Sequence, residues 1–283
     1  MNIEKLASQL SWKIPFAQKY FSKKSAQNYS LEDLKGFFES EQLALQAAQH
    51  IGSLLQPGWS ELKTSQLLET YLRDHGVKHF FHRAFVWFGE RTKFQGIHHY
   101  KSYAPSHRIL QDGEVYILDV APIYKNYTCD VGFTGCIGSN KKFEASKKTL
   151  NTFYKKIPQL FQKNLKPSEI WNEIDSLIMK KGLQNIHKKY PFGVLGHRVH
   201  IQNRSIPEPH PFHFGLGSYT KFMTNGLFSQ LLNQDYKGPL KGLWAIEPHL
   251  ACDQFGFKFE YLYYHSKKYS GWLKDYPELK DPL

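Results

Sequence analysis

Five residues with metal-binding or acid–base side chains lie in strand-like segments of the last two thirds of this chain. They are Asp119 in ILDVAP, Asp130 in NYTCDVGFTG, His197 in VLGHRVH, Glu247 in LWAIEPHL and Glu260 in FGFKFEYLYYH. A carboxylate inside an apolar strand is unfavourable unless it is paired, bound to a metal ion or neutralised. Four such conflicts in one chain indicate a shared function.

The four carboxylates form two pairs with hairpin spacing. Asp119 and Asp130 are eleven positions apart on either side of a turn, and Glu247 and Glu260 are thirteen apart. In a hairpin, such pairs can face each other across neighbouring strands, where both ionise only with a cation between them. Oxygen-rich ligation with one imidazole suits Mn²⁺, Co²⁺, Fe²⁺ or Zn²⁺. A catalytic metal ion needs an open coordination position, which five protein ligands would not leave on a single ion. The five residues therefore predict two divalent ions that share bridging carboxylates. Such a pair of ions is suited to hydrolysis.

Each of these residues also has a purely structural interpretation. Asp130 beside a turn is more often an exposed loop residue or a cap, and His197 after Gly196 would serve equally as a half-buried histidine. Glu260 would pair with Lys258 on the surface. The conjunction of two similar hairpins with an imidazole between them favours the shared site.

Composition limits the class of protein. The chain has 283 residues, of which 41% are hydrophobic, and no run approaches 18 apolar residues, so we expect a soluble globular protein without a membrane span. The opening segment MNIEKLASQLSWKIPF lacks the apolar core of a secretory signal. The three cysteines form no CxxC pair, and Cys129 is predicted to be a buried free thiol. These observations favour the cytoplasm.

The charge pattern bears on partners. A formal net charge of +12 can attract nucleic acid, but most lysines occur as doublets in amphipathic helical patterns, as on a solvated face. We therefore do not expect nucleic acid to be the main partner.

The elements repeat along the chain. After a polar arm or short helix over residues 1–30, a helix is predicted from Leu31, capped by Ser30 with Asp33 at its third position, and a second helix follows Ser60. A similar pair is predicted over 143–165 and from Ser168 to Gly182.

Pro57 and Pro167 occupy corresponding places in the two copies, and strand-like HRAFVWFG and KKYPFGVLGHRVHI follow the helix pairs. The segment EVYILDVAPIYKNYTCDVGFTGCIG predicts two strands around a turn at Asn126, and residues 243–265 predict a second hairpin. The predicted class is α+β, with two pseudo-symmetric α/β halves around a central antiparallel sheet. A catalytic domain would span 31–265, followed by a tail over 266–283.

These motifs resemble a known family. ILDVAPIYKNYTCDVGFTG is similar to the first metal-binding hairpin of the pita-bread metallopeptidases, which include methionine aminopeptidases and Xaa-Pro aminopeptidases or prolidases. VLGHRVH resembles the family's glycine–histidine segment, AIEPHL its Ile-Glu-Pro strand and GFKFEYL its closing strand. The resemblance extends from about Leu31 to His265 and implies the pita-bread fold.

The resemblance also implies roles for the five residues. Asp119 would bind one metal ion, Asp130 and Glu260 would bridge, and His197 and Glu247 would hold the second ion. Glu247 would also be the general base that exchanges a proton with the bridging water.

Three further residues are predicted to act on the substrate. GIHHYKS resembles the prolidase-type stretch with a histidine before tyrosine, so His99 is the candidate catalytic and substrate-contacting histidine; the alternative is an exposed histidine pair on a loop. The family's second substrate histidine is replaced by Arg204. His200, His210 or His213 would take over its role, or Arg204 would supply a permanent positive charge.

Two other positions depart from the family pattern. Arg198 and His249 stand where glycine is usual in the family. These two departures leave the catalytic efficiency and the substrate specificity of the predicted enzyme open.

The predicted function is a metal-dependent exopeptidase of the Xaa-Pro aminopeptidase or dipeptidase type, acting on short peptides with two divalent ions as cofactors. A homodimer stays open. The alternatives are a catalytically weak or inactive pita-bread module that binds a protein or nucleic acid, and a hydrolase of a non-peptide C–N bond.

Overall fold

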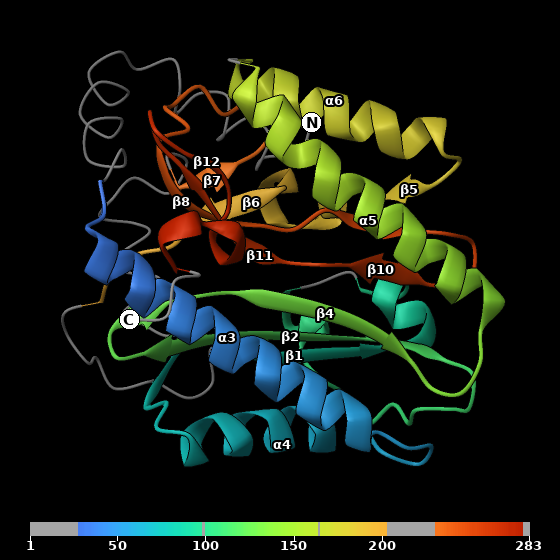
Figure 1. The fold of residues 1–283 in the computed structure, drawn as a ribbon. Coiled ribbons are helices and arrows are strands. Elements are labelled where there is room, and N and C mark those ends of the chain that lie inside the picture. Colours follow the sequence, from blue (N-terminus) through green and yellow to red (C-terminus); the bar gives the residue numbers. More distant parts are fainter. Residues whose placement is uncertain (1–27, 98–99, 164, 203–229, 280–283) are drawn as a thin grey trace.

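The computed structural model describes residues 28–97, 100–163, 165–202 and 230–279. Figure 1 shows strands in the middle of the molecule and helices packed against them. The helices are α3 (Leu31–Leu54), α4 (Glu61–Asp74), α5 (Lys141–Gln162) and α6 (Pro167–Lys180). The strands are β1 (His79–Phe88), β2 (Val115–Tyr124), β3 (Tyr127–Thr128), β4 (Val131–Cys136), β5 (Gln184–Asn185), β6 (Gly196–Arg198), β7 (Leu231–Leu232), β8 (Gly242–Ile246), β9 (His249–Ala251), β10 (Gly256–Lys258), β11 (Tyr261–His265) and β12 (Ser270–Trp272).

Several predicted features fall outside the described residues. They are nearly all of the N-terminal arm, His99, Arg204, His210 and His213.

The first helix pair begins at the predicted caps. Ser30 Oγ accepts a hydrogen bond from the Asp33 backbone N–H at 3.1 Å, and Asp33 Oδ2 accepts one from the Ser30 N–H at 3.0 Å. This reciprocal capping box satisfies two N–H groups that have no partner within the helix. Ser60 caps α4 in the same way by accepting from the Lys63 N–H at 3.1 Å.

The second helix pair is also present, but the two prolines differ in position. Pro167 is the first residue of α6, where its missing N–H costs nothing and its fixed φ fits the helix. Pro57 instead lies in the connection before the Ser60 cap of α4. The prediction that they are equivalent was therefore wrong at the level of local structure.

The strands of the first half form one antiparallel sheet around β2, which pairs with β1, β3 and β4. The predicted turn is present at Asn126, where Lys125 and Asn126 have φ of 48° and 73°. Two consecutive positive φ values give a tight hairpin turn whose twist matches that of the strands.

The second half is more broken than predicted. In KKYPFGVLGHRVHI only Gly196–Arg198 forms a strand, β6, and the residues before it form short 3₁₀ helices. Pro191 explains this difference, because proline has no N–H to donate to a strand ladder. Strand β8 pairs with β6 and β11, while β9 pairs with β5 and β10.

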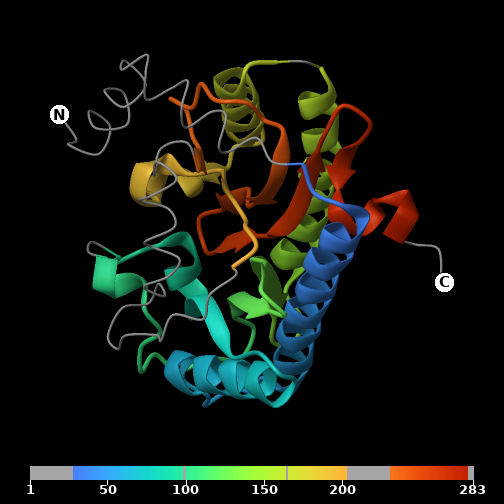
Figure 2. The same cartoon turned by 90° about the vertical axis from the view of Figure 1, so that its left-hand side faces the viewer.

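The two halves are joined by a backbone bridge. Gly132 N–H donates to the Glu260 carbonyl at 3.3 Å, and Glu260 N–H donates to the Gly132 carbonyl at 3.1 Å. Figure 2 shows α3 and α5 on one side of the strands. The bridge holds the end of one hairpin against the end of the other.

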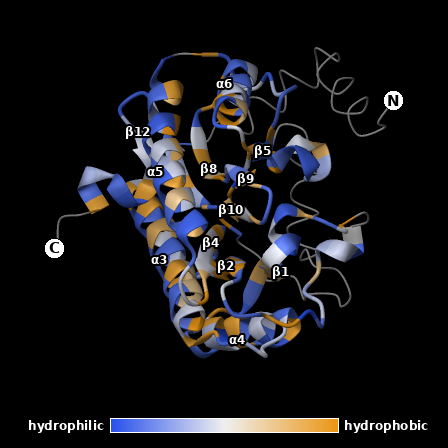
Figure 3. Ribbon diagram, turned by 90° about the vertical axis from the view of Figure 1, so that its right-hand side faces the viewer, coloured by the Kyte–Doolittle hydropathy of each residue, from blue (hydrophilic) through white to orange (hydrophobic). Residues whose placement is uncertain are grey.

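Two large apolar clusters hold the fold together. One joins α3 and α4 to the sheet around β2 and also includes Leu243 and Ala245 of β8 and Leu262 and Tyr264 of β11, whereas the other joins α5 and α6 to β8 and β11. Figure 3 shows hydrophobic residues on the central strands and on the sides of the helices. Burying each large apolar side chain contributes about 1.5–3 kcal/mol.

The sheet continues past the expected boundary at His265. Ser270–Trp272 pairs with β11 as β12, and Trp272 is only 2% exposed within the second core. Residues 270–272 therefore belong to the fold, because they pair with β11 and the side chain of Trp272 packs in a core.

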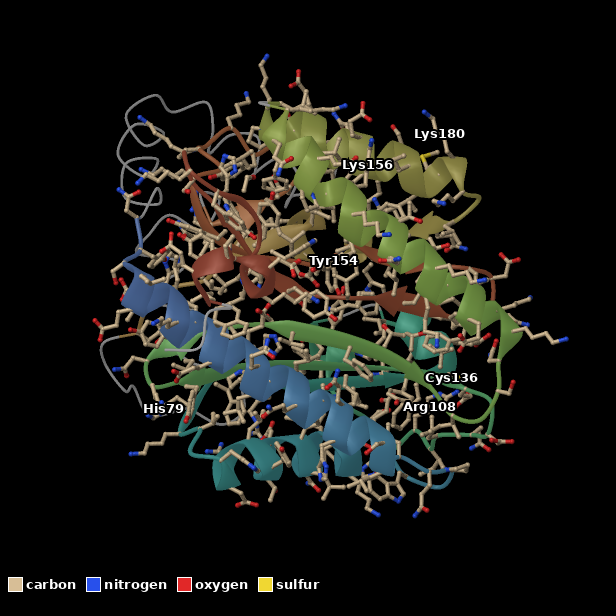
Figure 4. All side chains as sticks on the ribbon, in the orientation of Figure 1. His79, Arg108, Cys136, Tyr154, Lys156 and Lys180 are labelled. Carbon is tan, nitrogen blue, oxygen red and sulfur yellow. The ribbon has the colours of Figure 1, made fainter. Side chains whose placement is uncertain are left out.

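The outer helices carry much of the positive charge. Lys141, Lys142, Lys147, Lys148, Lys155 and Lys180 are exposed, as predicted for a solvated face. Figure 4 shows Lys156 and Lys180 on α5 and α6. Over the residues described, no helix combines the length and the apolar character of a membrane span.

A buried glutamate on α3 gives a test of the fold. Burial raises the pKa of Glu41 to about 7, although its Oε1 accepts a hydrogen bond from the Leu262 N–H at 2.6 Å. The folded chain thus keeps this proton to a higher pH than the unfolded chain does. The stability that the protonated Glu41 side chain contributes is fully present below about pH 4.5 and is lost as the pH rises to about 7.

We expect Glu41→Gln to remove this pH dependence and to raise the free energy of unfolding at pH 8 by up to about 3 kcal/mol, at about 1.4 kcal/mol per pKa unit. Urea unfolding at pH 5 and pH 8 measures the effect. Glu39→Gln, on the same helix in an exposed ion pair with Lys125, is the control. An equal change in stability at both pH values for Glu41→Gln would contradict the prediction.

Candidate metal centre

The structure brings all five predicted ligand residues into one buried cluster. Their exposed fractions are 4% for Asp119, 2% for Asp130, 7% for His197, 7% for Glu247 and 1% for Glu260. None is an exposed loop residue. Their positions fit the prediction of a shared site, while their roles as ligands stay predictions.

The two aspartates are placed by the first hairpin, but not directly opposite each other. Asp119 on β2 pairs with Gly132 of β4, and Val120 pairs with Val131. Asp130 lies in the break between β3 and β4, next to Cys129. The register is the same on both sides of this break, with Ile123 opposite Thr128 and Val120 opposite Val131. It sets Asp130 opposite Ala121, two positions from Asp119, so the two carboxylates approach diagonally.

The two glutamates are placed by the second hairpin. Ile246 and Tyr261 form the last pair of the β8–β11 ladder. Glu247 and Glu260 lie directly beyond that pair, where the chains leave the ladder at Pro248 and Phe259. The Gly132–Glu260 bridge then holds the second hairpin against the first.

Lys258 lies inside this cluster. Its Nζ donates to Asp119 Oδ2 at 2.6 Å, to Glu247 Oε2 at 2.8 Å and to Glu260 Oε2 at 2.8 Å. The residue is 1% exposed. Lys258 does pair with Glu260, as in the structural interpretation, but the pair does not lie on the surface, because residues two apart on a strand share a face and this face is buried.

His82 on β1 is a second unexpected member. It pairs with Ala121 of β2, and its Nε2 lies 3.0 Å from Asp130 Oδ2 and 3.4 Å from Asp119 Oδ1. The residue is 4% exposed. The cluster therefore contains two imidazoles.

His82 and His197 are oriented alike. Nδ1 of His82 donates to the Arg83 carbonyl at 2.8 Å, and Nδ1 of His197 donates to the Arg198 carbonyl at 3.2 Å. Since a carbonyl only accepts, Nδ1 carries the hydrogen in both rings. Nε2 of each ring then faces Asp130 Oδ2, at 3.0 and 3.1 Å. Such backbone contacts orient the imidazoles of metal sites.

The cluster perturbs the pKa of its members. Burial raises the pKa of Asp119 to about 6, even though Lys258 lowers it. Burial and the neighbouring carboxylates, led by Asp130, raise the pKa of Glu260 well above its usual range. Burial would also raise the pKa of Asp130, but the charge of His82 and hydrogen bonds from both histidines hold it below its usual range.

The two cationic side chains show the opposite balance. Burial lowers the pKa of Lys258, yet Asp119, Glu247 and Glu260 outweigh burial and hold it well above its usual range. Burial likewise lowers the pKa of His82, but the charge and hydrogen bond of Asp130 raise it to about 9.

Several buried oxygens in the cluster fit a metal ion. Asp119 Oδ1, Asp130 Oδ1 and Glu260 Oε1 accept no hydrogen bond from the described residues. Three overlapping groups have ligand atoms within 4.8 Å of one another: His82–Asp119–Asp130, Asp130–His197–Glu260 and Asp119–Glu247–Glu260. Carboxylate oxygens without donors, beside imidazole nitrogens, are the donor set that divalent transition metals take.

Arg198 and His249, which depart from the family pattern, do not join the cluster. Arg198 stacks on Trp244, and its NH1 and NH2 donate to the Lys241 and Pro239 carbonyls at 2.8 and 2.5 Å. His249 Nε2 donates to the Thr92 carbonyl at 2.7 Å, and Tyr190 OH donates to its Nδ1 at 3.1 Å.

Among the predicted substrate-contacting residues, His200 lies in the described part of the chain. His200 is 7% exposed, and its Nε2 lies 2.6 Å from Gln230 Oε1. Its role toward a substrate stays a prediction, like those of His99 and Arg204.

The sequence contained a signal for one of the two missed residues. Lys258 stands two positions before Glu260, so strand periodicity places both on one face. His82 has no comparable signal, because only the pairing of β1 with β2 brings it beside Asp130.

Together, the fold and this cluster place a candidate metal centre between two α/β halves. The family model for metallopeptidase family M24 matches residues 36–263. The chain belongs to this family, and the M24 peptidases are metal-dependent hydrolases.

Relatives and solved structures agree with this assignment. The chain is 28% identical over 110 residues to the uncharacterized peptidase YqhT of Bacillus subtilis, covering 38% of this chain and 29% of that protein. The Xaa-Pro dipeptidase of Bacillus anthracis has a TM-score of 0.63 at 19% identity, covering 90% of this chain and 64% of that one.

Two Thermotoga maritima enzymes share the fold as well. The X-Pro aminopeptidase has a TM-score of 0.64 at 13% identity, covering 98% of this chain and 78% of that one. The methionine aminopeptidase has a TM-score of 0.57 at 13% identity, covering 89% of this chain and its own full length, 100%. The α+β pita-bread fold that the sequence predicted is thereby confirmed.

The His82 pKa predicts how metal affinity depends on pH. With a pKa of about 9, His82 is an imidazolium at pH 7, and its Nε2 lies 3.0 Å from Asp130 Oδ2. A divalent ion at Asp130 repels that charge, so binding releases the proton. We expect the dissociation constant for Mn²⁺ to fall about tenfold per pH unit from pH 7 to 9, as for release of one proton.

Calorimetric titration in buffers of different ionisation enthalpy measures the protons released. His82→Phe should release fewer protons than the unaltered chain. Metal affinity that does not change with pH would contradict the expectation.

Proposed function

We propose that this chain is a metal-dependent peptidase of the Xaa-Pro type, which removes an N-terminal residue or splits a dipeptide at a bond before proline. The observation that carries the proposal is the buried cluster of four carboxylates and two imidazoles in a chain of the M24 family. Likeness to an Xaa-Pro dipeptidase and an X-Pro aminopeptidase supports the choice within the family.

The proposed ligands are Asp119, Asp130, His197, Glu247 and Glu260, for two divalent ions. Metal ions bound there would polarise the scissile carbonyl and lower the pKa of a bound water. The carboxylate oxygens without hydrogen-bond donors support this assignment.

Glu247 is the proposed general base. Its side chain is 10% exposed, whereas those of Asp119, Asp130 and Glu260 are 6%, 3% and 1% exposed. The carboxylate nearest to solvent is the best placed of the four to exchange a proton with a water molecule. His99 is the proposed catalytic histidine that contacts the substrate, and His200 and Arg204 are also proposed to bind the peptide.

The test is a dipeptide panel with proline in the second position, assayed with Mn²⁺, Co²⁺, Fe²⁺ and Zn²⁺. Turnover should require metal, and Asp130→Asn or Glu260→Gln should lower kcat/KM by at least about a hundredfold, since each removes a charged ligand. Dipeptides without proline should be cleaved more slowly.

Asp175→Asn is a matched control, because Asp175 is paired with Lys188 at 2.7 Å outside the centre. Its activity should equal that of the unaltered chain. Lack of turnover with every metal would leave the binding-module alternative, and turnover unchanged in Asp130→Asn would exclude the proposed centre.

A further inference from the structure

The ammonium group of Lys258 lies where a metal ion would otherwise bind. Its three carboxylate partners, Asp119, Glu247 and Glu260, are the members of one of the three candidate metal groups. Each of its three N–H bonds is matched by one carboxylate oxygen at 2.6–2.8 Å. The position is therefore already held by a cation that is part of the chain.

The stem of Lys258 is fixed in this place by the neighbouring strand. Its backbone N–H donates to Thr134 Oγ1 at 3.0 Å, and Thr134 Oγ1 donates to its carbonyl at 2.7 Å. Gly132, on the same strand as Thr134, leaves the space that the stem fills, since an added Cβ there would lie 2.2 Å from Lys258 Cε. Moving the ammonium out of the cluster would empty this packed space.

The side of the cluster that faces His82 and His197 has carboxylate oxygens without hydrogen-bond donors. Lys258 binds Oδ2 of Asp119 and Oε2 of Glu260, whereas Oδ1 of Asp119 and Oε1 of Glu260 lack a donor among the described residues. These two oxygens lie 3.4 Å from His82 Nε2 and 3.7 Å from His197 Nε2. Asp130 lies between the two imidazole rings, and its Oδ1 also accepts no hydrogen bond from the described residues.

We propose that the metal centre is asymmetric. A first divalent ion binds on the imidazole side, where His82, which is not among the five ligands predicted from sequence, forms one candidate group with Asp119 and Asp130. Lys258 occupies the second cation position, so that a second ion binds only by displacing its ammonium. This inference rests on the proposed metal-dependent function and specifies how that centre fills.

The test counts metal ions bound by the full chain. After dialysis against chelator, the protein is titrated with Mn²⁺ in a calorimeter, and bound metal is counted by elemental analysis. The unaltered chain should bind one ion tightly and a second at least about tenfold more weakly, because the lysine competes for shared carboxylates. Lys258→Met, of similar length but uncharged, should bind two ions tightly.

Matched variants separate position from overall charge. Lys189→Met removes the same charge from an exposed residue and should leave both binding steps unchanged. His82→Phe should weaken the first step by about 10- to 100-fold, the range for losing a group that supports a metal site. His187→Phe, a buried histidine outside the cluster, should not.

Folding of Lys258→Met is controlled by purifying it with Mn²⁺ present, since metal then replaces the missing cation. Melting temperatures with and without Mn²⁺ should differ more for Lys258→Met than for the unaltered chain. If Lys258→Met binds no more metal than the unaltered chain even when purified in this way, competition between the Lys258 ammonium and a second ion is excluded.

The remaining outcomes distinguish failure of this inference from failure of the proposed function. Two ions bound with equal affinity by the unaltered chain, or a first step that His82→Phe leaves unchanged, would overturn the corresponding part of the inference. Absence of metal binding in every variant would overturn both this inference and the proposed function. Ordered binding without peptide hydrolysis would overturn the proposed function alone.

Discussion

Mutual repulsion among four buried carboxylates is the constraint on which the rest of this structure depends. Charges so close together in an apolar interior are costly unless cations compensate them. The chain supplies that compensation with Lys258 among three of the carboxylates and with two imidazoles on Asp130. This intrinsic positive charge allows the acidic groups to be gathered before any ion binds.

The scaffold is arranged around the same cluster. Each half contributes one hairpin, and two apolar clusters, one of which includes residues of both halves, pack the rest of the fold around the polar ends of the hairpins. The Gly132–Glu260 bridge fixes the distance between them, and the missing side chain of Gly132 makes room for the lysine stem. One glycine thus serves both the backbone contact and the packing of the charged residue.

The layer behind the cluster is neutral and fully hydrogen-bonded. Lys258 Nζ lies 3.4 Å from Tyr190 OH, which donates to His249, and His249 in turn donates to the Thr92 carbonyl. Burial and the charge of Lys258 hold the pKa of His249 well below its usual range, so this ring adds no second positive charge. Arg198 directs its charge to carbonyl groups beside Trp244 instead.

The sequence by itself determined the class of fold and the five acidic and imidazole residues that meet in the cluster. The Ser30 and Ser60 caps, the helix pairs and the Asn126 turn depend on neighbours within a few residues, so local patterns were sufficient. The family motifs placed the hairpins in order between about Leu31 and His265, and the family model matches residues 36–263.

Tertiary structure alone decided which further side chains share that cluster. The diagonal placement of Asp130 depends on the register of β2 with β3 and β4, and His82 reaches it only through the β1–β2 register. Burial converted Lys258 from an expected surface partner into an internal cation. Periodicity places Lys258 on the face of Glu260, but the burial of that face and the position of His82 arise from contacts between residues far apart in the chain, which local patterns do not encode.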